Sequence, residues 1–378
     1  MATMATMAKK LTRLSVPNRV SFEVTSLCQA NCVFCEQPKR RTSAKLLKSR
    51  DLNTDEALDV LRNCRTFGVR SIFLTGGEPL MREDLEDLVD FCVNTGMDPI
   101  VSTNGILLTE ERAAALYEVG LRSIQIGLHG DSPITHDVIT KVPGGFAKTL
   151  EGLTNAAERF GRIDVNCVAI KSNFRRIPAL YDMLVKMGVE GALQVLRPMC
   201  SSEHMLAETM TPEEYEELES NLLPLEKKGF KIDSIGHLPG APKLSEFEKK
   251  QLVPHFGMIP HPDMTCYGCK TMIAILSDGT AVPCVTLRAV SLGNLLNEPL
   301  EKIWNGDVAK QVSELTPDKY QGVCGTCEKK WTCYSCRGVA FALTNNVYGD
   351  DISCEKLNPH RKHNAPKLSA ADDLPPKK

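Results

Sequence analysis

The sequence predicts an α/β protein, a partial (β/α)6 TIM-like barrel followed by a cysteine-rich domain. Six segments with strand character each precede a helical segment. Six units are too few to close an eight-stranded barrel, so we expect an open parallel sheet with right-handed crossovers. Eight of the 15 cysteines then gather between positions 266 and 354.

The alternating segments can be placed one by one. Leu58, Leu61 and Cys64 share one face of the first helical segment, and Gly68 ends it. Cys64 and, by the same spacing, Cys92 are therefore expected to be packing residues. The strands are predicted at residues 20–24, 71–75, 99–103, 123–128, 162–170 and 192–197, and the helices at 55–67, 82–94, 109–119, 146–159, 177–187 and 211–228.

Other segments carry less periodicity. Residues 39–50 are rich in Lys and Arg, which is typical of a solvated surface segment or of a docking site for an acidic peptide or partner. The expected domains are a disordered N-terminus at 1–17, the barrel at 18–235, a linker at 236–265, the cysteine-rich domain at 266–358 and a disordered tail at 359–378.

Composition excludes several classes of protein. The formal net charge of −2 argues against a broad nucleic-acid or anionic-membrane footprint. No apolar run reaches the length of a membrane span, and residues 1–14 lack the apolar core of a secretory signal. An odd number of cysteines in such a chain favours metal ligation over a disulfide framework. We therefore expect a cytoplasmic protein with no nucleic-acid or membrane partner.

The first group of cysteines reads Cys28-x3-Cys32-x2-Cys35 and follows the first predicted strand. This spacing fits a structural zinc site poorly, because such a site needs four closed ligands. It fits a 4Fe-4S cluster better, and a cluster held by three thiolates leaves its fourth iron open to a small molecule. Three buried cysteines or part of a zinc knuckle are the alternatives that the residues alone leave open.

This motif resembles the signature of the radical S-adenosylmethionine (radical SAM) superfamily, Cys-x3-Cys-x-aromatic-Cys, with Phe34 in the aromatic place. The resemblance implies that Cys28, Cys32 and Cys35 bind a 4Fe-4S cluster. It also implies that the open iron holds S-adenosylmethionine, which one electron cleaves to methionine and a 5′-deoxyadenosyl radical.

A second motif, Gly76-Gly77-Glu78-Pro79, follows the second predicted strand. Its glycines allow the backbone to approach a ligand closely, and Glu78 supplies a carboxylate suited to an ammonium group. Alone, this sequence would be an ordinary turn. In the radical SAM superfamily the same element holds the methionine amino group, and here it lies in register with the cysteine motif.

The resemblance implies further cofactor contacts near the strand ends. Relatives often have Ser-Leu-Asp-Gly where this chain has Gly-Leu-His-Gly, so His129 is either a ligand-facing group or a packed histidine. Lys141 is the charged residue where relatives often have an arginine. The predicted contacts are Phe34, Gln37, Gly76, Gly77, Glu78, Pro79, Ser102, Asn104, Gly127, His129, Lys141, Asn166 and Leu193.

The later cysteines form two complete four-ligand sets, which read alone could be zinc sites. Their order, Cys266-x2-Cys269-x14-Cys284 and then Cys324-x2-Cys327-x5-Cys333-x2-Cys336-x17-Cys354, resembles the SPASM extension of radical SAM enzymes. The resemblance implies two auxiliary 4Fe-4S clusters, three in all, and thus a C-terminal iron-sulfur domain. The implied ligands interleave, with Cys266, Cys269, Cys284 and Cys336 on one cluster and Cys324, Cys327, Cys333 and Cys354 on the other.

Fully ligated auxiliary clusters have no open iron, so electron transfer is their natural role and an oxidised product is expected. The first hypothesis is an oxidoreductase of natural-product biosynthesis that cross-links or dehydrogenates a ribosomally made peptide. The second is a dehydrogenase, epimerase or decarboxylase acting on a small sugar or aminocyclitol-type metabolite. The third is a non-catalytic iron-sulfur electron carrier. Val285 stands where sulfatase-maturing relatives have an aspartate base, which disfavours that reaction.

The hypotheses also name partners and a catalytic candidate. The expected partners are an electron donor such as flavodoxin or ferredoxin and a substrate, either a small molecule or a peptide. A peptide would be held by a separate recognition protein or by residues 39–50. Cys200 follows the sixth predicted strand and is the candidate hydrogen donor if the reaction is an epimerisation.

Overall fold

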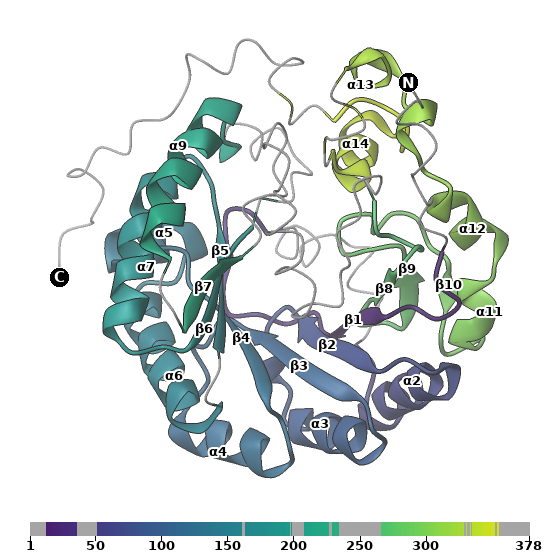
Figure 1. Ribbon diagram of the computed structural model, residues 1–378. Helices are drawn as coiled ribbons and strands as arrows, with labels where there is room; N and C mark the ends of the chain where they lie inside the picture. Colours follow the sequence, from purple (N-terminus) through teal and green to yellow (C-terminus); the bar gives the residue numbers. More distant parts are fainter. Residues whose placement is uncertain are drawn as a thin grey trace, which may run out of the picture.

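The computed structural model describes residues 13–35, 51–160, 163–196, 198, 208–226, 229–233, 266–328, 330, 333, 335–351 and 354. In this part of the chain one open sheet curves through the molecule, and helices lie along its outer side (Figure 1). The strand order is β10-β9-β8-β1-β2-β3-β4-β5-β6-β7. The sheet is parallel from β8 to β7; β9 pairs antiparallel with β8, and β10 pairs antiparallel with β9.

The elements have the following bounds. The strands are β1 (Arg19–Thr25), β2 (Ser71–Gly76), β3 (Asp98–Thr103), β4 (Ser123–Gly127), β5 (Ile163–Val168), β6 (Gly191–Leu196), β7 (Phe230–Asp233), β8 (Met272–Ile275), β9 (Thr280–Val282) and β10 (Gly293–Asn294). The helices are α2 (Thr54–Phe67), α3 (Leu85–Asn94), α4 (Glu110–Glu118), α5 (Pro133–Thr140), α6 (Gly145–Phe160), α7 (Ile177–Lys186), α9 (Pro212–Leu222), α11 (Leu300–Trp304), α12 (Asp307–Ser313), α13 (Gly322–Thr326) and α14 (Arg337–Thr344).

The hydrophobic core lies between the sheet and these helices. Phe22 of β1 and Trp304 of α11 are fully buried in one continuous cluster, so the two cysteine-bearing regions share a core. Cys64 and Cys92 are buried in the same cluster, as the helical spacing predicted. Among the described residues, none of the helices combines the length and apolar character needed to cross a bilayer.

The six predicted strand–helix units are confirmed, and the differences have local causes. Helix α3 begins at Leu85 rather than at residue 82, because Pro79–Met81 form a short 3-10 helix that Arg82 ends in an extended conformation. Helix α5 was not predicted, since its eight residues are too few to show a clear period. Strand β7 was not predicted either, and it continues the parallel sheet beyond β6.

Several predictions lie wholly or mostly outside the described residues. They concern residues 1–12 of the N-terminus predicted at 1–17, the basic segment 39–50, the linker 236–265 and the tail 359–378. Residues 13–17 are described, and the N–H of Leu14 donates to the carbonyl of Lys270 over 2.9 Å. The domain boundaries therefore stay predictions.

The cysteine-rich region continues the barrel sheet directly. Strand β8 pairs in parallel with β1, with Arg19 opposite Met272 and Phe22 opposite Ile275. A hairpin turn at Asp278 and Gly279 then leads into β9, and Gly279 has a φ of 83°. The backbone N–H of Thr280 donates to a carboxylate oxygen of the turn residue before that glycine over 3.0 Å.

An ion pair spans the same junction. Arg288, which follows β9, donates both terminal nitrogens to the carboxylate of Glu23 on β1, with 2.6 Å between Nη2 and Oε2. The Glu23 side chain is 5% exposed and that of Arg288 is 18% exposed. The pair therefore joins the strand before the first cysteines to the segment after Cys284 in a largely water-excluded place.

We predict that replacing Arg288 with Met lowers the free energy of unfolding by about 3 kcal/mol, because Glu23 would stay buried without the cation that faces it. Urea denaturation of anaerobically prepared protein measures this change. Lys302→Met is the control, since its pair with Glu298 is exposed and should contribute less than about 0.5 kcal/mol. Equal midpoints for both variants would show that the Arg288 pair does not stabilise the junction.

Candidate functional site

Backbone contacts join the Gly-Gly-Glu-Pro element, residues 76–79, to the chain that leads into the cysteine loop, residues 28–35. The N–H of Gly77 donates to the carbonyl of Thr25 over 2.7 Å, and the N–H of Glu78 donates to the carbonyl of Leu27 over 2.6 Å. A Cβ at Gly77 would overlap the carbonyl oxygen of Leu27, and one at Gly76 would overlap that of Thr25. In the structure, these glycines thus allow a close approach of the chain to itself.

Glu78 is almost fully buried, with 1% of its surface exposed. Its Oε1 accepts hydrogen bonds from Thr103 Oγ1 at 2.6 Å and from the N–H of Leu80 at 3.1 Å, and its Oε2 accepts one from the N–H of Asn104 at 2.8 Å. Burial raises the pKa of Glu78 to about 6, although these three bonds oppose the rise. A carboxylate has about four acceptor positions, so the carboxylate can accept one bond beyond these three.

Asn104 lies between Glu78 and the cysteine loop. Its Oδ1 accepts hydrogen bonds from Gln29 Nε2 at 3.1 Å and from the N–H of Ile106 at 3.0 Å, and its Nδ2 lies 3.9 Å from Cys28 Sγ. Sequence reasoning singled out Asn104 but missed Thr103 beside it. The signal was present, because both belong to the polar sequence Ser-Thr-Asn-Gly at the end of the third predicted strand.

The far side of the cysteine loop is attached to the end of helix α5. The N–H of Asn31 donates to the carbonyl of Thr140 over 3.0 Å, and the N–H of Val33 donates to that of Ile139 over 2.9 Å. The predicted contact Lys141 follows at once as the left-handed C-cap of α5, and it is exposed. The helix that sequence analysis missed therefore holds one side of the loop.

His129 packs behind the cysteine loop. Its ring meets Phe34 edge-on with 4.7 Å between centroids and stacks on His136 at 5.8 Å. Its Nδ1 accepts the N–H of Val168 at 3.3 Å, which assigns the ring proton to Nε2. Burial, with a smaller effect of His136, lowers the pKa of His129 to about 3, so the ring is neutral near pH 7. In the structure His129 is thus a buried, neutral histidine in contact with Phe34.

The three thiols of the cysteine loop interact electrostatically. Burial, followed by the charges of Cys35 and Cys28, raises the pKa of Cys32. The N–H of Cys35 donates to the carbonyl of Cys32 over 3.0 Å, which folds the loop into a turn. Iron binds thiolates, so a bound cluster would stabilise the charged form that burial and the neighbouring thiols disfavour. The donor set fits a cluster held by three cysteines.

Four of the later thiols, Cys266, Cys269, Cys284 and Cys336, lie close to one another, and two of them flank Thr286. Its hydroxyl lies 3.0 Å from Cys284 Sγ and 3.8 Å from Cys336 Sγ. Burial is the main cause that raises the pKa values of Cys266, Cys269 and Cys284. Charge interactions between the thiols add to the rise. Cys269 interacts with Cys266 and Cys284, and Cys266 and Cys284 each interact with Cys336. The structure therefore brings together the four residues predicted for one auxiliary cluster.

Two aspartates order the chain around the other predicted set. Asp350 accepts the N–H of Cys324 at 2.8 Å, and the N–H of Asp351 donates to Cys324 Sγ at 3.4 Å. The carboxylate of Asp351 accepts the N–H of Cys336 at 2.7 Å, and its carbonyl accepts the N–H of Cys354 at 2.9 Å. Segments that are 30 residues apart in the sequence are thereby held side by side.

The cysteines as a whole have the chemistry that iron–sulfur clusters require. No described cysteine forms a disulfide. Among the described residues, no three His, Cys, Asp or Glu side chains converge as ligands of a single metal ion do. In a 4Fe-4S cluster each thiolate binds a different iron, so its ligands are spread around the cluster. Cys327 and Cys333, the remaining members of the second set, are partly buried.

The remaining predicted contacts fall in different surroundings. Ser102, Gly127 and Asn166 are partly buried on β3, β4 and β5. Leu193 is fully buried in the hydrophobic core, so any cofactor contact from it would come from its backbone. Gln37 and Cys200 lie outside the described residues.

Comparison with known families matches both halves of the site. The model of the radical SAM superfamily matches residues 22–184, which include the cysteine loop and the Gly-Gly-Glu-Pro element. A model described as an iron-sulfur cluster-binding domain, the SPASM domain, matches residues 266–328.

Curated relatives match nearly the whole chain. An AdoMet-dependent heme synthase of Methanosarcina barkeri is 26% identical over 345 residues, which cover 90% of this chain and 97% of the relative. A PqqA peptide cyclase of Rhizobium meliloti is 25% identical over 368 residues, which cover 92% of this chain and 89% of the relative.

Solved structures share the fold. SuiB of Streptococcus suis superimposes with a TM-score of 0.65 at 16% identity, over 90% of this chain and 78% of SuiB. A structure of anSMEcpe with bound AdoMet and Cp18Cys peptide gives 0.63 at 16% identity, over 87% of this chain and 93% of that one. Motifs, fold and both family models agree: residues 22–184 match the radical SAM superfamily and residues 266–328 match the SPASM iron-sulfur domain, which implies S-adenosylmethionine and 4Fe-4S clusters as cofactors.

Proposed function

We propose that this radical SAM/SPASM enzyme is an oxidoreductase that cross-links or dehydrogenates a ribosomally made peptide. The observation that carries the proposal is the second group of cysteines, which provides eight thiols for two fully ligated clusters. Such clusters exchange electrons rather than bind substrate. A substrate that has lost a hydrogen atom must lose one more electron to become an oxidised, closed-shell product, and these thiols would hold its acceptor.

Different residues of the chain would bind the cluster and the S-adenosylmethionine. When bound, the first cluster and S-adenosylmethionine supply the 5′-deoxyadenosyl radical that takes the substrate hydrogen. Cys28, Cys32 and Cys35 hold this cluster. The acceptor position that remains on Glu78 takes the ammonium group of the methionine moiety, and the N–H groups around the carboxylate keep it in place.

The peptide substrate is supported from two sides. The PqqA peptide cyclase of Rhizobium meliloti is similar over 92% of this chain. SuiB was also solved bound to the precursor peptide SuiA, and that structure shares this fold with a TM-score of 0.63. An electron donor such as flavodoxin or ferredoxin would complete the reaction.

A haem-related tetrapyrrole is the second candidate substrate. Its support is the similarity to AdoMet-dependent heme synthases and to a Fe-coproporphyrin III synthase, each 26% identical over at least 345 residues. The same oxidising machinery would serve either substrate, so the proposals differ in what fills the site and not in its chemistry.

A direct experiment separates the two substrates. The anaerobically reconstituted protein is given dithionite, S-adenosylmethionine and either a precursor peptide encoded beside this chain or Fe-coproporphyrin III. We expect 5′-deoxyadenosine to form in step with a peptide that has lost two hydrogens. Conversion of the tetrapyrrole alone would replace the peptide proposal, and no 5′-deoxyadenosine under any condition would contradict both.

We predict that Cys284→Ala separates cofactor cleavage from substrate oxidation. Loss of one auxiliary cluster should remove about four of about twelve irons, while the cysteine loop and Glu78 stay intact. S-adenosylmethionine cleavage should persist, and product formation should fall by at least about 100-fold, which corresponds to roughly 2.7 kcal/mol.

Chromatography of 5′-deoxyadenosine and product measures both yields. Cys64→Ala is the control because Cys64 is a core residue, and it should keep its full iron content. Unimpaired product formation by the iron-depleted Cys284 variant would contradict the electron-accepting role.

We predict that S-adenosylmethionine binding weakens below pH 6. The ammonium group binds the ionised form of Glu78, whose pKa is about 6 because the residue is buried. At pH 5 the affinity should be about tenfold lower than at pH 7 to 8. The stability of the cofactor-free protein changes with pH in the opposite direction to the affinity. The raised pKa of the Glu78 carboxyl contributes stability below pH 4.5, and this contribution is lost as the pH rises through 6.

Equilibrium dialysis between pH 5 and pH 8 measures the affinity. Glu78→Gln should bind at least about tenfold more weakly at pH 7.5 and should lose this pH dependence, because it has no carboxyl proton. A wild-type affinity that does not change over the range would contradict the assignment of the ammonium group to Glu78.

A further inference from the structure

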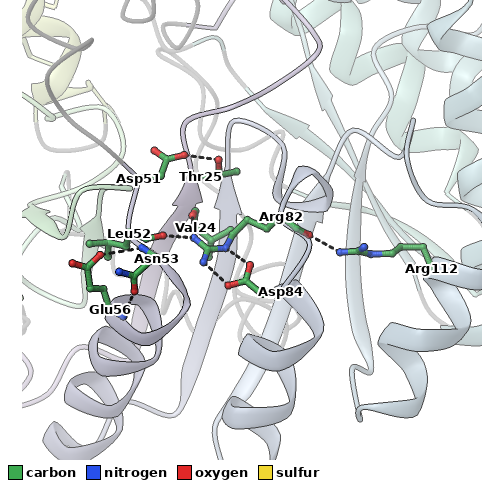
Figure 2. Close-up of polar contacts among 9 residues, drawn as sticks. All are labelled: Val24, Thr25, Asp51, Leu52, Asn53, Glu56, Arg82, Asp84 and Arg112. Atoms are coloured by element: carbon green, nitrogen blue, oxygen red, sulfur yellow. Dashed lines mark hydrogen bonds and ion pairs between the residues drawn. The ribbon is translucent and has the colours of Figure 1, made fainter.

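Arg82 is a nearly buried arginine that the proposed chemistry does not use. Its side chain is 9% exposed and lies between β1, the start of α2 and the start of α3 (Figure 2). One terminal nitrogen, Nη1, donates to two backbone carbonyls, that of Val24 at 2.7 Å and that of Leu52 at 2.8 Å. The other two nitrogens, Nε and Nη2, donate to the carboxylate of Asp84 at 2.7 and 2.6 Å.

The two carbonyls belong to the chain on either side of the cysteine loop. Val24 lies on β1, four residues before Cys28. Leu52 directly precedes the N-cap of α2. Its neighbour Asp51 also binds the end of β1, because its Oδ2 accepts Thr25 Oγ1 at 2.6 Å (Figure 2). Arg82 therefore ties the chain before and after the cysteine loop to one point.

The backbone of Arg82 belongs to the other half of the site. Its N–H donates to the carbonyl of Pro79 over 3.0 Å, which ends the short 3-10 helix that Glu78 caps. Its own carbonyl accepts Arg112 Nη2 at 2.6 Å, so the residue is fixed from the far side as well (Figure 2). The side chain of Arg82 thus reaches the chain that flanks the cysteine loop, and its backbone holds the turn that presents Glu78.

These contacts require the shape of an arginine. A guanidinium presents five N–H donors in a fixed plane, and here they serve two carbonyls and one carboxylate at the same time. A lysine ammonium is a single point on a flexible stem and would hold one of these partners well and the others poorly. Asp84 neutralises the buried charge, which allows an arginine to stay at this place.

We propose that Arg82 is a positioning residue for S-adenosylmethionine, which fixes the separation between the cysteine loop and Glu78. The inference rests on the proposed function, since that function places the cluster that binds S-adenosylmethionine on the cysteine loop and the ammonium group of its methionine moiety on Glu78. The cofactor bridges the elements, so a change in their separation weakens binding even when both elements are present. Arg82 itself touches neither the cofactor nor the cluster in this account.

The test compares Arg82→Lys with wild type in the anaerobically reconstituted full chain. We expect the variant to keep its full iron content and to bind S-adenosylmethionine at least about tenfold more weakly, by equilibrium dialysis. The electron paramagnetic resonance signal of its reduced clusters should also respond less to saturating cofactor. Arg175→Lys is the matched control, because Arg175 makes a two-bond pair with Glu217 at an exposed place, and it should match wild type.

Each outcome decides the question. An Arg82→Lys protein with full iron, wild-type affinity and an unchanged spectral response would overturn the proposal. If that variant fails to take up iron, Asp84→Asn keeps Arg82 and weakens only its carboxylate contact, and wild-type affinity in Asp84→Asn would overturn it instead. Absence of S-adenosylmethionine binding by the wild type would contradict the proposed function and not the positioning role alone.

Discussion

The close backbone contact between the Gly-Gly-Glu-Pro element and the end of β1 is the constraint on which the rest of the site depends. Two hydrogen bonds hold the chain at Thr25 and Leu27 against Gly77 and Glu78, and no side chain larger than hydrogen fits at the glycines. The contact sets where the cysteine loop begins, and it sets where the buried carboxylate of Glu78 points. The three thiols of the cysteine loop and the carboxylate of Glu78, which lies more than 40 residues later in the sequence, are thereby placed at one end of the sheet.

The same strand also connects the site to the second group of cysteines. Strand β1 pairs with β2 on one side and with β8 on the other, so the chain that carries the later thiols continues the barrel sheet. The ion pair of Glu23 and Arg288 lies at this junction, close in sequence to Cys28 on one side and to Cys284 on the other. Electron exchange between distant cysteine groups needs a fixed relation between them, and a shared sheet provides it.

Sequence reasoning predicted the parallel sheet, the two cysteine systems and the Gly-Gly-Glu-Pro element, because each has a local pattern of period or spacing. It did not find Thr103, Arg82 or Asp51, whose roles come from contacts with residues far along the chain. It also missed α5 and β7, which are short. The role of the two glycines was predicted as access for a ligand, whereas the structure shows them against the backbone of residues 25–27. A sequence shows that a glycine is present, but only the fold shows what comes close to it.

Gly77→Ala tests the central claim most directly, because it adds one methyl group at the contact and removes no ligand. Anaerobically reconstituted protein is analysed for iron and for formation of 5′-deoxyadenosine. This account predicts that the variant loses the first cluster, about one third of its iron, together with S-adenosylmethionine cleavage, while the auxiliary clusters stay bound. A Gly77→Ala protein with full iron and wild-type cleavage would contradict it.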